Sequence, residues 1–495
     1  MRGERLSGLD TAFLQIESEN AHMHVGVVLT FAGDAPRYEE LLSLLERRLH
    51  LVPRYRQRLL APPLPLDRPR WVDDPHFNLR FHLRHTGLPA PGSESQLKEL
   101  AARILAQRLD RERPLWELWL VEGLEGDRFA IVAKTHHAVV DGISGVDIVT
   151  VLLDAARDPV PTPAPPPWLP RPLPSRAEQL VEAAVEPLRW PLQIARAARA
   201  AADDPARLLD DARTALGGAA ALARAAFLRG GARTPYNGKI GPHRRFDWVR
   251  CSLDDLRAIK KRLGGTVNDV VLACVTGALH HHLQVRGERV AGVELKALVP
   301  VSVRAEVERG VLGNRVAAMI ATLPVWCEDP RERLALVREQ MRDLKESGQA
   351  VGAKVLTELG DFAPPTILAQ ASRLFATQRV FNLVVTNVPG PQFPLYLLGR
   401  RLIEPFPVVP LARDQALGIA LMSYDGRINF GLLGDYDLMW DLKTFARCLR
   451  CSLRELAEAA GIELTEPSPY LAVPDPAAVE ATAFAGSDDG ARPAT

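Results

Sequence analysis

Two adjacent histidines, His136 and His137, are the residues of this chain best suited to acid–base chemistry, and Asp141 and Gly142 follow closely. An imidazole titrates near pH 6.5, so it can accept a proton at neutral pH and later return it. Asp141 could fix the local geometry or bind a cation, and Gly142 permits a close backbone approach. Because no serine or cysteine lies within this stretch, we expect direct attack by a deprotonated substrate, without a covalent enzyme intermediate.

Two other interpretations of the histidine pair stay open. The histidines could be packed core or loop residues with satisfied polar atoms. A histidine followed four residues later by a carboxylate could also be half of a metal site. A strand-to-helix turn does not give the spacing of helical metal ligands, however, and the sequence shows no second cluster of cysteines and histidines. We therefore predict no metal ion at this turn.

The predicted elements on either side place the histidines at a turn. Residues 129–133 form a short apolar run with β-branched side chains, which predicts a buried strand. Residues 143–156 have apolar side chains at helical spacing, which predicts a helix. Side chains at such a turn can face a cleft while rigid elements hold their backbone.

Length and composition bound the class of protein. A chain of 495 residues with 47% hydrophobic residues predicts two domains with sizeable cores. With 61 basic and 60 acidic residues, nothing indicates a nucleic-acid partner. Five cysteines predict a reducing compartment, and Cys448 and Cys451 are predicted to be buried thiols. Without a signal-peptide pattern or a long apolar run, we expect a cytoplasmic protein with at most peripheral membrane contact.

A proline-rich segment divides the chain. Nine of the sixteen residues from 159 to 174 are proline, which predicts a stiff linker. Residues 176–233 have helical periodicity and could be a solvated connector or an amphipathic surface at a membrane or lipid droplet. We therefore predict an N-terminal domain, a linker, a C-terminal domain and a disordered tail, over residues 1–158, 159–235, 236–466 and 467–495.

The His-His-x-x-x-Asp-Gly block resembles the active-site motif of the chloramphenicol acetyltransferase-like superfamily of CoA-dependent acyltransferases. Further blocks occur in the order found in bacterial wax ester synthase/diacylglycerol acyltransferases, and the resemblance extends over residues 4–465. They include residues 6–14, 23–26, Pro114-Leu115-Trp116, Asn268-Asp269 and 382–391. By residue type alone, the Pro-Leu-Trp block could be a packed turn and the Asn-Asp pair a helix cap.

The resemblance implies an α/β fold of two chloramphenicol acetyltransferase-like mixed-sheet domains around a shared tunnel. His137 would be the general base, His136 and Gly142 would shape the turn, and Asp141 would be structural. Expected substrate-binding or supporting residues are Pro114, Leu115, Trp116, Asn268, Asp269 and the small residues Gly360 and Ala363.

The implied reaction moves a long-chain acyl group from acyl-CoA to the hydroxyl of diacylglycerol or of a long-chain alcohol. The products would be a triacylglycerol or a wax ester. Acyl-CoA is then a substrate, and no cofactor or metal is expected because a thioester is already activated. Contact with a membrane or a lipid droplet would be peripheral.

Three other functions are compatible with the motif. A condensation domain of a peptide synthetase shares it, but we would expect carrier or adenylation domains beside it. A natural-product acyltransferase would take its acyl group from a carrier protein. A non-catalytic lipid-binding or droplet-coat protein would keep its activity when His137 is replaced by alanine.

Overall fold

The computed structural model describes residues 3–63, 68–139, 148–159, 165–181, 234–302, 316–346 and 381–465. They form two six-stranded mixed sheets with helices, which confirms the predicted α/β class with two sheet-rich units. The five cysteines are buried, as predicted for Cys448 and Cys451. None of the helices in these ranges has the length and apolarity to cross a bilayer. The expected helices between residues 182 and 233 and the expected tail lie outside the described residues.

The first sheet includes the strand that leads into the histidine pair. Its strands lie in the order β12-β13-β2-β7-β6-β5, and only β5 and β6 pair in parallel. Their bounds are β2 His24–Ala32, β5 Leu83–Gly87, β6 Trp116–Leu124, β7 Arg128–His136, β12 Tyr396–Leu397 and β13 Arg400–Val408. The same half also contains a small three-stranded sheet, made of β1 Glu4–Arg5, β3 Gln57–Leu60 and β4 Arg70–Asp73.

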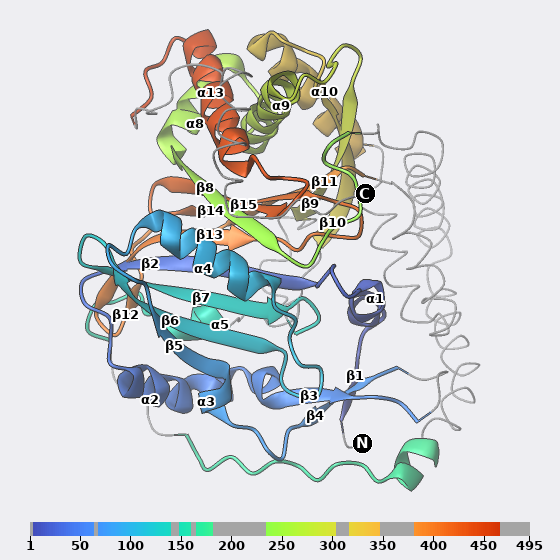
Figure 1. The fold of residues 1–495 in the computed structure, drawn as a ribbon, viewed down its shortest axis with the longest axis vertical. Coiled ribbons are helices and arrows are strands. Elements are labelled where there is room, and N and C mark those ends of the chain that lie inside the picture. Colours follow the sequence, from blue (N-terminus) through green and yellow to red (C-terminus); the bar gives the residue numbers. More distant parts are fainter. Residues whose placement is uncertain are drawn as a thin grey trace, which may run out of the picture.

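Helices cover both faces of the first sheet. The helices of this half are α1 Gly8–Ile16, α2 Tyr38–Arg48, α3 Leu79–His82, α4 Glu94–Ala106 and α5 Ile148–Leu152. In Figure 1, α4 lies between the two large sheets, and α2 and α3 lie on the far side of the first sheet. Two 3-10 turns, Leu49–Leu51 and Pro53–Arg56, lead from α2 to β3.

The second six-stranded sheet has the helices of its own half on one face. Its strand order is β10-β9-β11-β14-β15-β8, and β11 pairs in parallel with both of its neighbours. The strands are β8 Arg244–Ser252, β9 Glu294–Ser302, β10 Val316–Pro324, β11 Leu383–Pro389, β14 Leu417–Tyr424 and β15 Arg427–Asp435. The helices are α8 Leu253–Leu263, α9 Val267–Val285, α10 Pro330–Glu346 and α13 Leu442–Ala460. They lie on the face turned away from the first sheet (Figure 1), with α9 in contact with the other three.

A strand from the C-terminal half joins the two sheets. Strand β13 pairs with β2 and completes the first sheet, although it lies between β11 and β14 in the chain. It also packs on β14 and β15, and its Phe406 stacks on Trp248 of β8 with ring centroids 4.3 Å apart. The sequence does not predict this exchange of β13 out of the predicted C-terminal domain at 236–466, because an apolar pattern predicts a strand but not the sheet that it joins.

Local sequence signals explain several element boundaries. Ser93 and Gln96 form a capping box at the start of α4, in which the Ser93 N–H donates to Gln96 Oε1 at 2.7 Å. Thr266 caps α9 in the same way. The hairpin between β14 and β15 turns at Asp425 and Gly426, whose φ angles of 43° and 81° suit a two-residue type I′ turn.

A partly buried ion network also joins the halves. Arg250 of β8 donates to Glu94 of α4 at 2.6 Å and to Glu404 of β13 at 2.7 Å. The Glu404 side chain is only 4% exposed. Although burial opposes it, Arg250 and Arg128 lower the pKa of Glu94. The network therefore connects both sheets and the helix between them through charge-assisted hydrogen bonds.

We expect Glu404→Gln to lower the free energy of unfolding by about 1–3 kcal/mol, because the substitution weakens a buried, charge-assisted contact with Arg250. The control is Glu39→Gln, because Glu39 also forms two hydrogen bonds with one arginine, Arg80, but on the surface. Its free energy of unfolding should not change measurably. Equal losses in urea unfolding of the two variants would contradict a special role for the network.

Candidate active site

The pairing of β2 with β7 fixes the backbone of the histidine turn. His24 and His136 are partners in this antiparallel register. The His136 N–H donates to the Leu115 carbonyl at 2.9 Å, and the His137 N–H donates to the Met23 carbonyl at 2.8 Å. The main-chain N–H of each histidine is therefore bonded to a different neighbouring segment. Both residues lie where β7 ends in a turn, as predicted.

Phe13 restrains the side chain of His137. Its ring stacks on that of Phe13 in α1, with centroids 4.0 Å apart and an interplanar angle of 25°. Because the main-chain N–H of His137 donates to the Met23 carbonyl, both the backbone and the ring of this residue are held in place.

Burial keeps His137 neutral. It lowers the pKa of His137 below its ordinary value of 6.5, and the bond to its own backbone only partly opposes this shift. Burial therefore favours the neutral imidazole, which is the protonation state that a general base requires.

His136 has a different role, although it is the adjacent residue. Its Nδ1 accepts from the Ala138 N–H at 3.1 Å, so the proton of the neutral ring is on Nε2. The side chain is 1% exposed, and burial together with the cations Arg111 and Arg108 lowers its pKa to about 3. His136 is therefore a buried hydrogen-bond acceptor within the turn.

A buried carboxylate beside the histidines was not predicted. Glu17, at the end of α1, is 2% exposed in its side chain and lies 4.0 Å from His136 Nε2 and 3.8 Å from His24 Nε2. Arg111 donates to it from Nε at 2.9 Å and from Nη2, and Arg108 lies 3.6 Å away. Because Glu17 and Arg111 are 94 positions apart, no local pattern could have paired them.

The Pro114-Leu115-Trp116 block helps to hold the histidine turn in place. Leu115 provides the carbonyl that accepts from His136. The buried Trp116 donates from its indole N–H to the Tyr55 carbonyl at 2.8 Å and stacks on His82 with centroids 4.7 Å apart. The block thus holds the start of β6 beside β7. The contacts that the structure describes for it are structural.

Asn268 and Asp269 lie in the other half of the molecule, at the start of α9. Asp269 accepts from the Thr266 N–H at 2.7 Å and completes the cap of that helix. Asn268 Oδ1 accepts from Asn387 of β11 at 3.4 Å. These contacts fix α9 against its own sheet, so the helix-cap interpretation holds for Asp269. Four other predicted site residues, Asp141, Gly142, Gly360 and Ala363, lie outside the described residues.

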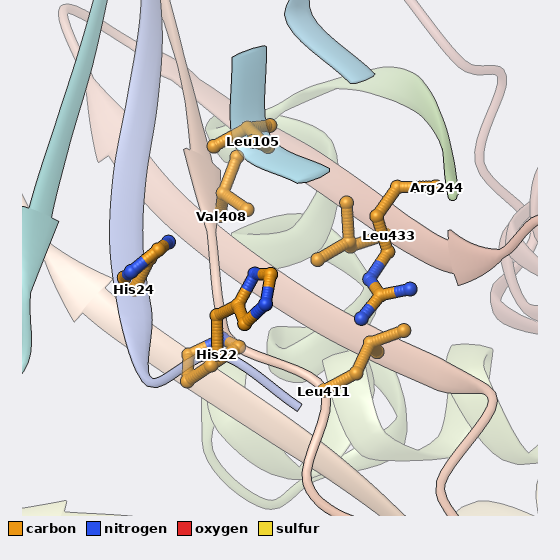
Figure 2. Close-up of a pocket in the computed structure, with 8 residues that line it drawn as sticks. His22, His24, Leu105, Arg244, Val408, Leu411 and Leu433 are labelled. Carbon is orange, nitrogen blue, oxygen red and sulfur yellow. The ribbon is translucent and has the colours of Figure 1, made fainter. Parts of the chain in front are cut away.

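A narrow pocket next to this turn lies where the two halves meet. Figure 2 shows the imidazole of His22 and the guanidinium of Arg244 turned toward each other across it, with His24 on the strand behind. Its volume of about 10 Å³ is close to the least that a single water needs. The remaining lining residues are Leu105, Val408, Pro410, Leu411 and Leu433. Within the part of the chain that the structure describes, no group of three potential metal ligands occurs.

We expect His136→Ala to cost about 1–3 kcal/mol of folding free energy, because it leaves the buried Ala138 N–H without an acceptor. His137→Ala removes a ring of the same size that accepts no hydrogen bond from the described chain, so it should cost less. Urea unfolding of both variants compares the two. A larger loss for His137→Ala would contradict the structural role assigned to His136.

The chain matches the family model described as the wax ester synthase/diacylglycerol acyltransferase catalytic domain over residues 6–271, and that of the family's C-terminal domain over residues 312–457. The probable diacylglycerol O-acyltransferase tgs1 of Mycobacterium tuberculosis H37Rv is 34% identical over 464 residues, which cover 91% of this chain and 95% of that protein. The tgs2 protein of the same strain is 32% identical, with 92% and 98% covered.

Solved structures agree with these matches. The wax ester synthase/diacylglycerol acyltransferase from Marinobacter aquaeolei VT8 has a TM-score of 0.65 at 28% identity and covers 93% of this chain and 100% of its own. The first condensation domain of the calcium-dependent antibiotic synthetase has a TM-score of 0.56 at 17% identity, with 96% and 99% covered, and shares the fold alone. Because the family's catalytic and C-terminal models match in order and a relative at 34% identity covers 91% of the chain, the chain belongs to the wax ester synthase/diacylglycerol acyltransferase family.

Proposed function

We propose that this protein moves a long-chain acyl group from acyl-CoA to the hydroxyl of diacylglycerol or of a long-chain alcohol. The observation that most supports this function is the placement of His137, a half-buried imidazole that stacks on Phe13 and whose main-chain N–H donates to the Met23 carbonyl. Family membership supports the reaction class, since the relatives above are named as diacylglycerol O-acyltransferases and as a wax ester synthase.

In the proposed reaction, Nε2 of His137 removes the proton of the acceptor hydroxyl as its oxygen attacks the thioester carbonyl carbon. The C–O bond forms, the tetrahedral intermediate collapses and the C–S bond breaks. The CoA thiolate leaves with the electron pair and takes the proton back from the His137 imidazolium. Atoms and charge balance without a metal or a redox cofactor, because the thioester supplies the activated acyl group.

The surrounding residues would act on His137 and not on the substrate. His136 and the Leu115 carbonyl hold the turn, and Asp141 and Gly142 are proposed to continue it as shaping residues. Gly360 and Ala363 remain proposed as small residues that leave room for an acyl chain. Because both acceptors partition into lipid, we propose that the protein works in the cytoplasm and touches a membrane or lipid-droplet surface peripherally.

Thiol release from a long-chain acyl-CoA, with diacylglycerol or hexadecanol present, tests this function. We expect release that depends on the acceptor and that falls about 10²-fold or more in His137→Ala, the usual contribution of a general base. The rates with the two acceptors rank triacylglycerol against wax ester synthesis.

The matched control is Thr386→Ser, which keeps a hydroxyl at a position far from the histidine turn in sequence. Its rate should stay near that of the unaltered protein. No release with either acceptor from folded protein would contradict the acyl-CoA-dependent function. Release only from an acyl-carrier protein would favour the natural-product alternative, and unchanged activity in His137→Ala would favour a lipid-binding role.

The pH profile gives a second test. Since burial lowers the pKa of His137 below 6.5, the neutral base persists below pH 6.5, and activity is lost only as pH falls through the lowered pKa. We expect kcat/KM to be level from about pH 8 down to pH 6.5 and to decline at lower pH. An acidic limb centred above pH 6.5 would contradict the buried, neutral state of His137.

Stability must be followed over the same range. His24 and His136 are buried and have lowered pKa values, that of His136 being about 3. The unfolded chain therefore binds protons from pH 6.5 downward while the folded chain does not, so the free energy of unfolding falls as pH decreases between these values. Unfolding measured at each pH separates this loss from titration of the base.

A further inference from the structure

We propose that Phe13 is a positioning residue for His137, and that its ring holds the imidazole in the orientation that presents Nε2 to the acceptor hydroxyl. The proposal rests on the general-base function of His137 given above. Phe13 itself takes no part in proton transfer, because a phenyl ring has neither donor nor acceptor.

The geometry of the contact supports this role. The two rings lie 4.0 Å apart between centroids and are 25° from parallel, which is a stacked arrangement. Phe13 covers one face of the imidazole, and the Met23 carbonyl holds the main-chain N–H of His137. Together these two contacts restrict the orientations that the ring can take.

The helix that presents Phe13 is itself fixed. Ser7 caps α1 by accepting from the Asp10 N–H at 3.0 Å. At the other end, Arg111 donates to the Leu14 carbonyl at 2.8 Å and to the carboxylate of Glu17. Phe13 lies between these two anchors, so the stack on His137 is made by a rigid element.

The same N-terminal segment contacts His137 twice. Phe13 covers the ring, and the Met23 carbonyl, ten residues later, accepts from the His137 N–H at 2.8 Å. The charged and titratable groups of the described chain that gather at this turn are His136 on β7, His24 on β2, Glu17 at the end of α1, and Arg108 and Arg111 before β6. None of them lies between Phe13 and the imidazole, because the rings are in contact.

A second stacked pair offers a matched control. Phe31 of β2 and Phe129 of β7 stack with centroids 4.9 Å apart and 10° between their planes. Both are fully buried in the core of the same half. Phe31→Leu therefore makes the same change of a stacked phenylalanine in the same half of the molecule, without a catalytic ring as its partner.

The test compares kcat, KM and pH profiles of Phe13→Leu, Phe13→Tyr and Phe31→Leu. We expect Phe13→Leu to lower kcat about 10-fold or more, with KM for acyl-CoA little changed, because only the orientation of the base is lost. Its acidic limb should move up toward pH 6.5, since water reaches the exposed imidazole face. Phe13→Tyr should keep most of the activity, because it retains the ring, and Phe31→Leu should lower stability but not kcat.

A double-mutant cycle with His137→Ala separates this proposal from the proposed function. If Phe13 acts through His137, Phe13→Leu lowers the rate in the unaltered protein and has no further effect in His137→Ala. Equal effects in both backgrounds, or a Phe13→Leu profile like that of Phe31→Leu, would overturn the positioning role. Unchanged activity in His137→Ala alone would instead overturn the general-base function. Should Phe13→Leu unfold, Phe13→Met replaces it in the same cycle.

Discussion

The antiparallel pairing of β2 with β7 is the constraint on which the rest of the site depends. Its register places Met23 where its carbonyl accepts from the His137 N–H. Gly26 makes this pairing close, because a Cβ there would lie 2.8 Å from the Ala133 carbonyl oxygen. A slip by one residue would turn every side chain of β2 to the opposite face. Since β13 pairs on the other edge of β2, the C-terminal half also stabilises this register.

Burial then gives two identical side chains different chemistry. His136 and His137 are both neutral because burial lowers both pKa values. They differ in their contacts: His136 accepts at Nδ1 from the Ala138 N–H, and the ring of His137 stacks on Phe13. The first ring is thereby a fixed part of the turn, and the second is the proposed base.

Local patterns predicted what depends on neighbours in sequence, and little else. The strand before the histidines, the caps at Ser93 and Thr266 and the hairpin at Asp425 all follow from short-range rules. Motif resemblance identified the histidine turn and the block that ends at Trp116. Contacts between distant segments were not predictable: the approach of Glu17 to Arg111, the stack of Phe13 on the second histidine, and the addition of β13 to the first sheet. Each is decided by tertiary packing, which no periodicity encodes.

The central claim is that Nε2 of His137 removes the proton of the acceptor hydroxyl. A crystal structure of the protein with CoA and a long-chain alcohol or diacylglycerol tests it most directly. We expect the hydroxyl oxygen to lie within hydrogen-bond reach of His137 Nε2, at about 2.6–3.2 Å, with the imidazole still stacked on Phe13. A hydroxyl bound out of reach of Nε2, with another side chain of the protein positioned to take its proton, would contradict it.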